Sequence, residues 1–176
     1  MLYASPDGTV DANGQQFWNA NPACCDFFGA GVDDSGYLRE LIEEIASSYD
    51  VDVKSVFLVG HSNGHFMAYR AACDHADLIA GVAGLAGSML PGGSGCQPSE
   101  PVHQLHVHGT ADQVVPFAGG PLLNGTVSVA GAEEAVAFWA TEAGCNASPT
   151  NDAPLDLDSA LTGAETEVVR YEGCQA

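Results

Sequence analysis

Basic residues are scarce in this chain of 176 residues, which has 4 Lys and Arg against 23 Asp and Glu and a formal net charge of −19. Nucleic acids and anionic lipids are bound through clustered Lys and Arg, and the four cations do not cluster: Arg39, Lys54, Arg70 and Arg170. The sequence also lacks an apolar run of about 18 residues, the length that a membrane-spanning helix needs. We therefore expect no nucleic-acid partner and no insertion into a membrane.

Cysteine motifs of the CxxC type are also missing, and no histidine stands at a zinc-ligand spacing from a cysteine pair. The six cysteines are nevertheless many for a reducing compartment, and they favour disulfides and a secreted or extracellular protein. A bridge between the adjacent Cys24 and Cys25 is strained, so we expect each to bond elsewhere. We pair Cys145 with Cys174, and one of Cys24 or Cys25 with Cys73. The N-terminus shows no signal-peptide pattern, so either secretion is wrong or the true start lies upstream.

Hydrophobic residues make up 46% of the chain, enough for a packed core, and the length suits one domain over residues 1–176. Short apolar or alternating runs predict strands over 55–59, 79–85, 102–108 and 167–171. The first of these reads as a strand buried on both faces, as parallel strands are. Apolar residues at three- and four-residue steps predict helices over 34–49, after residue 64 and over 132–143. Strands that alternate with helices indicate an α/β fold with a mostly parallel sheet flanked by helices.

The motif that carries chemistry is Gly60-His61-Ser62-Asn63-Gly64, a G-x-S-x-G between a predicted strand and a predicted helix. This context is typical of a nucleophile elbow, in which Ser62 occupies a strained turn and projects its hydroxyl above the sheet edge. A Cβ at Gly60 or Gly64 would crowd the neighbouring strand or helix. The following helix directs free amides at the site, so the Asn63 N–H is the predicted oxyanion-hole donor. The alternative is a glycine-punctuated turn with a surface serine.

A serine nucleophile needs a base and an acid that orients the base. Asp112 follows the third predicted strand at the sheet edge where Ser62 is also expected, so it is the predicted triad acid. The alternative is that Asp112 only turns or caps its loop. In this fold class the catalytic histidine follows the acid, yet the last histidine of the chain is His108.

Each of the six histidines has a structural interpretation instead of the base role. His61 is expected to pack beneath the turn, and His65 to point away from the nucleophile. His75 suits a helix C-terminus, where a cation is favoured. The remaining three belong to a strand and its exit: His103, His106 and His108. The triad is therefore incomplete within this sequence.

Several further motifs accompany the elbow: Pro6-Asp7-Gly8 followed by Phe17-Trp18, Cys24-Cys25 before Val32-Asp33-Asp34, Ala71-Ala72-Cys73, Gly84-Leu85-Ala86-Gly87, His108-Gly109-Thr110-Ala111-Asp112, Pro116 and Gly119-Gly120. Over nearly the whole chain they resemble the esterase family that contains secreted polyhydroxybutyrate depolymerases and the related feruloyl and acetylxylan esterases. The resemblance implies an α/β-hydrolase fold and hydrolysis of carboxylic esters through an acyl-enzyme. It implies Ser62 as the nucleophile and Asp112 as the acid, with no metal or organic cofactor.

The sequence departs from that family in three places. The elbow ends in Gly64-His65 where relatives carry two glycines, a change expected to crowd the floor of the pocket. The family's oxyanion-loop His-Gly would come before Met1, and its catalytic histidine would come after Ala176. We therefore interpret the sequence as a single α/β-hydrolase domain truncated at its N- and C-terminal ends. Alone, such a chain is expected to be poorly soluble and inactive on p-nitrophenyl esters.

The expected function is that of a serine esterase acting on a polyhydroxyalkanoate or other polyester, or on feruloyl or acetyl esters of polysaccharides. A non-catalytic binding protein on the same scaffold is one alternative, and an acyltransferase that uses Ser62 is another. The scarcity of Lys and Arg disfavours a strongly anionic polymer as substrate. Four aromatic residues either line an apolar pocket or form core: Phe17, Trp18, Phe27 and Phe28. Glycosylation sequons begin at Asn124 and Asn146. The sequence leaves the oligomeric state open.

Overall fold

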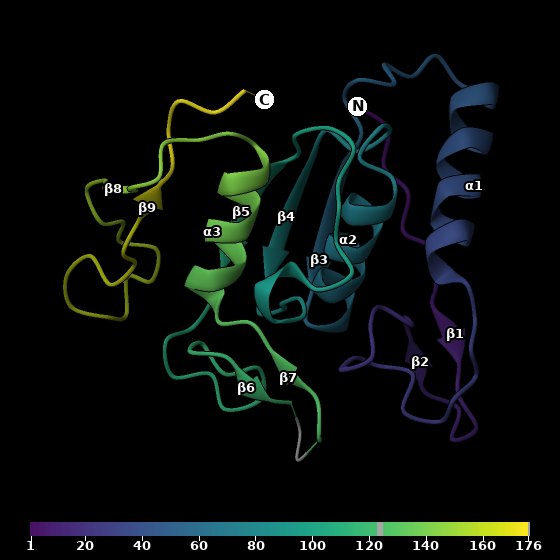
Figure 1. The fold of residues 1–176 in the computed structure, drawn as a ribbon, viewed down its shortest axis with the longest axis horizontal. Helices are drawn as coiled ribbons and strands as arrows, with labels where there is room; N and C mark the ends of the chain where they lie inside the picture. Colours follow the sequence, from purple (N-terminus) through teal and green to yellow (C-terminus); the bar gives the residue numbers. More distant parts are fainter. Residues whose placement is uncertain (123–124, 176) are drawn as a thin grey trace.

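The computed structural model describes residues 1–122 and 125–175, and it centres on a three-stranded parallel sheet in the order β3-β4-β5 (Figure 1). The strands are β3 (Phe57–His61), β4 (Gly81–Leu85) and β5 (His103–Val107). The register pairs Val59 with Ala83, and Ala83 with Leu105. Parallel neighbours need a crossover connection, and a helix provides it between β3 and β4. The predicted α/β arrangement is therefore present.

Three helices accompany the sheet: α1 (Asp34–Ser48), α2 (Asn63–Asp74) and α3 (Ala132–Glu142), with a short 3-10 turn, η1 (Pro91–Gly93). The N-cap residue of α1 is Asp33, whose side chain accepts from the Gly36 N–H at 2.9 Å. The helix α2 packs on β3 and β4, α3 packs on β5, and α1 packs on α2. The helices that touch the sheet therefore cover one of its faces.

The other face of the sheet is open within the part of the chain that the structure describes. Phe57 and Val59 of β3 are 63% and 80% exposed, and Leu105 of β5 is 62% exposed. Leu58, which points the opposite way, packs against the core under α2 and α3. The prediction that the strand over 55–59 is buried on both faces is therefore wrong for this chain.

The helix α2 lies between two clusters of buried side chains. The first cluster joins Tyr69 of α2 to Val82 of β4 and Trp139 of α3. The second joins Phe66 of α2 to Cys24 and to residues of the loops around it. Because both sides of α2 are buried, the helix that follows the elbow is fixed over most of its surface.

Three two-stranded antiparallel pairs complete the fold: β1 (Thr9–Val10) with β2 (Gln16–Phe17), β6 (Gly120–Pro121) with β7 (Ser128–Val129), and β8 (Thr150–Asn151) with β9 (Val169–Arg170). The strand predicted over 167–171 is present only as β9, and it pairs with β8 instead of joining the parallel sheet. Asn124, one of the two predicted glycosylation sites, lies outside the described residues. Within 1–122 and 125–175, no helix combines the length and the apolar character that crossing a bilayer requires.

Three disulfides connect the cysteines as Cys24–Cys25, Cys73–Cys96 and Cys145–Cys174. The predicted bridge between Cys145 and Cys174 is confirmed. The expectation that Cys24 and Cys25 each bond elsewhere is wrong, and so is the predicted bridge from one of them to Cys73. Cys24 belongs to the second buried cluster, while Cys73 packs against the first and lies with its Cα 5.0 Å from that of Cys96. Three disulfides suit an oxidising compartment.

Candidate active site

Ser62 lies between β3 and α2 on a sharply turned backbone, with φ 51° and ψ −121°. Residues other than glycine rarely adopt a positive φ, and they keep it only where the surrounding structure enforces it. Here the Ser62 N–H donates to the Leu85 carbonyl at 2.8 Å. The Ser62 carbonyl accepts from the N–H groups of His65 and Phe66 at 2.9 and 3.1 Å. The turn is therefore held by β4 on one side and by the first turn of α2 on the other.

The Ser62 hydroxyl is not used to cap the helix, although Ser62 is the N-cap residue of α2 and is half-buried. An N-cap serine usually accepts a hydrogen bond from an amide of the first turn. The first amides of a helix have no partner within it, and the Asn63 amide is the first of α2. Within the described part of the chain, a hydroxyl that is not used as a cap therefore stands beside amide donors, as a nucleophile next to an oxyanion hole would.

The two glycines of the elbow differ in their surroundings. A Cβ on Gly60 would overlap the backbone of Gly64 and His65, so the steric requirement predicted for Gly60 is confirmed. A Cβ on Gly64 would have none of the described atoms outside the helix's own backbone within 4 Å, so the same prediction for Gly64 is wrong. The reason is that Gly64 borders a cleft that Trp18 and Met67 also line.

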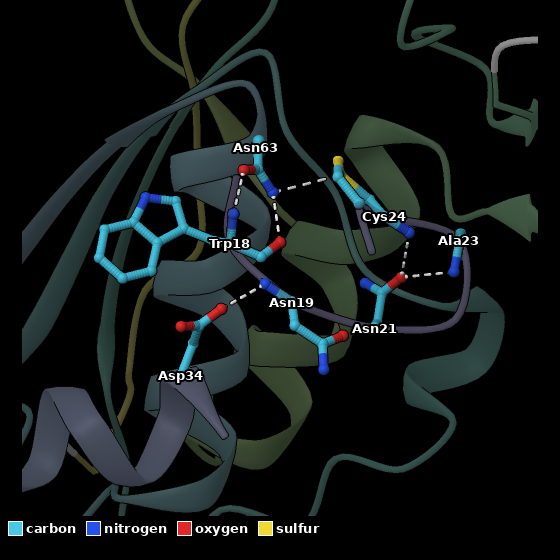
Figure 2. Close-up of a disulfide and its surroundings, with 8 residues drawn as sticks. Trp18, Asn19, Asn21, Ala23, Cys24, Asp34 and Asn63 are labelled. Carbon is cyan, nitrogen blue, oxygen red and sulfur yellow. Dashed lines mark hydrogen bonds between the residues drawn. A yellow bond between two sulfur atoms is a disulfide. The ribbon is translucent and has the colours of Figure 1, made fainter. Parts of the chain in front are cut away.

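The side chain of Asn63 ties the elbow to the segment that carries the Cys24–Cys25 bridge (Figure 2). Its Oδ1 accepts from the Trp18 N–H at 2.7 Å, and its Nδ2 donates to the Trp18 carbonyl at 2.9 Å. Nδ2 also lies 3.5 Å from the sulfur of Cys24. The Asn19 N–H donates to Asp34 of α1 at 2.6 Å and so anchors the same segment a second time. Sequence reasoning assigned Asn63 a backbone role only, because no short motif connects residues 45 positions apart.

Asp112 lies in the loop after β5, with a side chain that is 19% exposed. Its Oδ1 accepts from the N–H groups of Val114 and Val115 at 2.8 and 3.0 Å. Partial burial raises the pKa of Asp112, but these two bonds and the nearby His108 and His61 lower it by more. The net pKa lies below the usual value, so the carboxyl is ionised near neutral pH. Ionisation is what an acid that orients a histidine requires.

The predicted nucleophile and acid lie at the same edge of the sheet. The register pairs His61 with Leu85, and Leu85 with Val107. The last residues of β3 and β5 therefore lie level with one another, and Ser62 and the loop of Asp112 follow them at the same edge of the sheet. Two strand spacings of about 4.8 Å separate β3 from β5 by roughly 10 Å. His61, the neighbour of Ser62, is close enough to the Asp112 carboxylate to contribute to its lowered pKa.

His65 is wholly buried between α2 and β4. Its Nδ1 accepts from the Gly87 N–H at 3.0 Å, and its ring fills the space where a Cβ on Gly84 or Gly87 would lie. Burial, together with His106 and His108, lowers the pKa of His65 to about 3. The expected crowding of the pocket floor is therefore wrong, because two glycines make room for the ring on the covered side of the sheet.

The remaining histidines have different surroundings. His106 bonds to His108, at 3.0 Å between Nε2 and Nδ1. His75 is the C-cap residue of α2, as predicted, and its Nε2 lies 3.1 Å from the Ser35 hydroxyl. His61 was expected beneath the turn but is exposed, because it follows Phe57 and Val59 on the open face of β3.

A cleft of about 950 Å³ lies between the N-terminal segment, α1 and the outer edge of β3. Of the four aromatic residues considered for a pocket, only Trp18 lines this cleft. Phe17 is core, with 8% exposure, whereas Phe27 and Phe28 are 60% and 59% exposed and neither expectation holds for them. Within the residues described, no group of His, Cys, Asp and Glu is arranged to hold a metal ion.

Comparison with known proteins gives matches over most of the chain. Residues 30–134 match the model of a phospholipase/carboxylesterase family. Feruloyl esterase B of Piromyces equi is 34% identical over 160 residues, which cover 87% of this chain and 28% of that protein. A probable feruloyl esterase C of Aspergillus niger is 35% identical over 89 residues, 50% of this chain and 32% of the relative. The bifunctional acetylxylan esterase/xylanase XynS20E of Neocallimastix patriciarum is 34% identical over 87 residues, 49% of this chain and 13% of the relative. The aligned segments thus span less than a third of each of these relatives.

Proposed function

The chain belongs to the phospholipase/carboxylesterase family, and from that premise we propose that it is a serine esterase that hydrolyses carboxylic esters through an acyl-enzyme. The observation that carries this proposal is the backbone of Ser62, whose positive φ presents a hydroxyl at a strand-to-helix turn. Backbone strain of this kind is found most often at active sites. The ionised Asp112 at the same edge of the sheet supports the proposal.

In the proposed reaction, Ser62 Oγ attacks the ester carbonyl while a histidine base accepts the hydroxyl proton. Asp112 orients that base and stabilises its charged form. The Asn63 N–H, at the positive end of α2, donates to the oxyanion of the tetrahedral intermediate. The alcohol then leaves with the proton from the base. Water, deprotonated by the same base, attacks the carbonyl of the acyl-enzyme, which releases the acid and restores Ser62. This chemistry requires no metal or organic cofactor.

Three histidines of the structure are not available as the base. His65 has a pKa of about 3, far below the value near neutrality that a general base needs. The two nitrogens of His106 bond to Tyr69 and His108, and those of His108 bond to His106 and the Val115 carbonyl. Oδ1 of Asp112 already accepts from the Val114 and Val115 amides, so Oδ2 is the proposed partner of the base.

Feruloyl or acetyl esters of polysaccharides are the proposed substrates, because matched relatives carry those names. Esters of polyhydroxyalkanoates are the second candidate. The net charge of −19 favours a neutral substrate over an anionic one. The three disulfides support an extracellular place of action.

The test is Ser62→Ala in the protein expressed from its complete coding sequence. We expect loss of labelling by a fluorophosphonate probe and loss of hydrolysis of p-nitrophenyl acetate and methyl ferulate. The matched control is Ser94→Ala, at an exposed serine after η1, which should retain both activities. Labelling that persists in Ser62→Ala would exclude Ser62 as the nucleophile.

The same assays separate the alternative functions. Transfer of the acyl group to an added alcohol without release of free acid would show an acyltransferase. Binding of an ester without labelling or turnover in the unmodified protein would show a non-catalytic binding protein. Hydrolysis of hydroxybutyrate oligomers in preference to methyl ferulate would favour the polyester substrate.

A further inference from the structure

A chain of three hydrogen bonds runs from α2 through β5 to the loop that carries Asp112. The hydroxyl oxygen of Tyr69 lies 2.8 Å from His106 Nδ1. His106 Nε2 lies 3.0 Å from His108 Nδ1, and His108 Nε2 lies 2.8 Å from the carbonyl oxygen of Val115. Tyr69 is 1% exposed, and the His108 side chain is 2% exposed. The chain is therefore shielded from water at both ends.

The last bond fixes the direction of the other two. A carbonyl oxygen can only accept, so His108 Nε2 must carry a proton. The other nitrogen of a neutral imidazole is an acceptor, so His108 Nδ1 accepts from the Nε2–H of His106. By the same rule, His106 Nδ1 accepts from the Tyr69 hydroxyl. Neutral rings therefore satisfy every polar atom of the chain.

Burial keeps two members of the hydrogen-bond chain, His106 and Tyr69, uncharged near neutral pH. Burial, with His108 adjacent, lowers the pKa of His106 to about 4. Burial raises the pKa of Tyr69, so its hydroxyl keeps the proton that it donates. The His65 ring, which also has a lowered pKa, packs at 4.8 Å from the His106 ring between centroids. Among the described residues, the charged group in contact with this hydrogen-bond chain is Asp112, whose Oδ2 lies 3.5 Å from His108 Nε2.

Val115 joins this chain to the carboxylate. Its carbonyl accepts from His108, while its N–H donates to Oδ1 of Asp112 at 3.0 Å. Among the described residues, the other oxygen, Oδ2, has only the long contact with His108. Because the His108 proton is directed at the Val115 carbonyl, Oδ2 remains available to another donor.

We infer that Tyr69, His106 and His108 are positioning residues for the triad acid. They hold the loop after β5 so that Asp112 presents Oδ2 to the catalytic base, and they connect this loop to the helix that begins at the nucleophile. The inference rests on the proposed function, because it has no meaning unless Asp112 orients a base.

Neutrality is part of this role. A second proton on His108 would face the Nε2–H of His106, so the bonds would have to reverse, with Tyr69 becoming an acceptor. His108 would then be a cation within 3.5 Å of Asp112 and would compete with the base for the carboxylate. The neutral chain leaves the carboxylate to the base.

The first test reads protonation directly and does not depend on activity. Nitrogen NMR of the protein labelled with 15N-histidine near neutral pH should show a protonated Nε2 and an unprotonated Nδ1 for both His106 and His108. A ring protonated at Nδ1 or at both nitrogens at either position would overturn the inference.

The second test is a double-mutant cycle between His108→Leu and Asp112→Asn, read as hydrolysis and as the rate of fluorophosphonate labelling. Because small displacements of a catalytic group are costly, His108→Leu alone should lower kcat by about 10- to 100-fold with little change in KM. In the Asp112→Asn background the same change should have less than about a twofold effect, since residues that act as one unit are not additive. His108→Gln keeps a donor for the Val115 carbonyl and should recover most of the loss.

Tyr69→Phe tests the first bond of the hydrogen-bond chain, and its matched control is Tyr171→Phe. Only Tyr69→Phe removes the hydroxyl that donates to His106, so only Tyr69→Phe should lower kcat. An equal loss from His108→Leu with and without Asp112 would show a purely structural role and overturn the inference. Hydrolysis that persists in Ser62→Ala would instead overturn the proposed function and the positioning role with it, while the nitrogen spectrum would still report the hydrogen-bond chain.

Discussion

Replacing Gly84 with Ala should strongly destabilise the protein, because the space for a side chain is already taken by His65. A Cβ on Gly84 would overlap three atoms of the His65 ring: Cδ2, Nε2 and Cε1. The ring is held by a hydrogen bond and by an aromatic neighbour. Its Nδ1 accepts from the Gly87 N–H, and its centroid lies 4.3 Å from that of the tilted Tyr69 ring.

The expected loss follows from the packing on both sides of the ring. Overpacking a core typically costs about 1–3 kcal/mol, and we expect about 3 kcal/mol here because the overlap is with three atoms of a wholly buried ring. For a chain of this size, that loss corresponds to a fall in Tm of about 6–12 °C. His65→Ala alone should cost about 2 kcal/mol, because the cavity it leaves is partly offset by removal of a buried Nε2 that has no partner among the described residues.

The decisive measurement is a double-mutant cycle of Gly84→Ala, His65→Ala and the double variant, in which urea unfolding gives the free energy of unfolding of each protein. The added methyl group enters the space left by the ring, so the double variant should be more stable than Gly84→Ala, with a coupling of at least about 2 kcal/mol. Gly64→Ala is the matched control, since a Cβ there is unobstructed and alanine is the better helix residue. If Gly84→Ala yields no soluble protein, the double variant should restore it. Additive losses, or an unchanged Gly84→Ala, would refute the packing argument.

Two further predictions concern pH and the disulfides. The lowered pKa values of His65 and His106, about 3 and 4, mean that the unfolded state binds more protons below about pH 6.5. The free energy of unfolding should therefore decrease as the pH is lowered, by up to about 1.4 kcal/mol per pH unit for each ring. His65→Gln should reduce this slope between about pH 7 and 5, whereas His103→Gln, at an exposed histidine, should not; equal slopes would contradict the prediction. Removing the Cys73–Cys96 bridge should cost about 3 kcal/mol in urea unfolding, and peptide mapping that joins Cys73 to Cys24 would contradict the observed pairing.

Local patterns predicted most of the parallel core. The helix over 34–49 appears as α1, the strand over 79–85 as β4 and the strand over 102–108 as β5, each shifted by a residue or two at its ends. The elbow was predictable for the same reason, because a strand, a turn and a helix follow one another within a few residues. The role of Gly60 depends only on atoms four and five positions away, so the sequence pattern was sufficient for it.

Contacts between distant residues could not be read in this way. The bond from Asn63 to Trp18 spans 45 positions, and the bond from Tyr69 to His106 spans 37. The disulfide of Cys73 depends on which cluster the end of α2 faces, and the spacing of the cysteines carries no information about that. The exposure of the open sheet face likewise depends on where α2 and α3 pack, which the apolar run over 55–59 does not reveal.

The site is supported from the covered side of the sheet, and the register explains how. Gly60 of β3 pairs with Gly84 of β4, and Gly84 pairs with His106 of β5. Two neighbouring strands therefore have no side chain in this row, and the space beneath the elbow is filled by the rings of His65 and His106. Gly60 thus makes room for the first turn of α2, and Gly84 makes room for the His65 ring. Because these contacts come from α2, β4 and β5, the geometry of Ser62 does not depend on what lies against the open face.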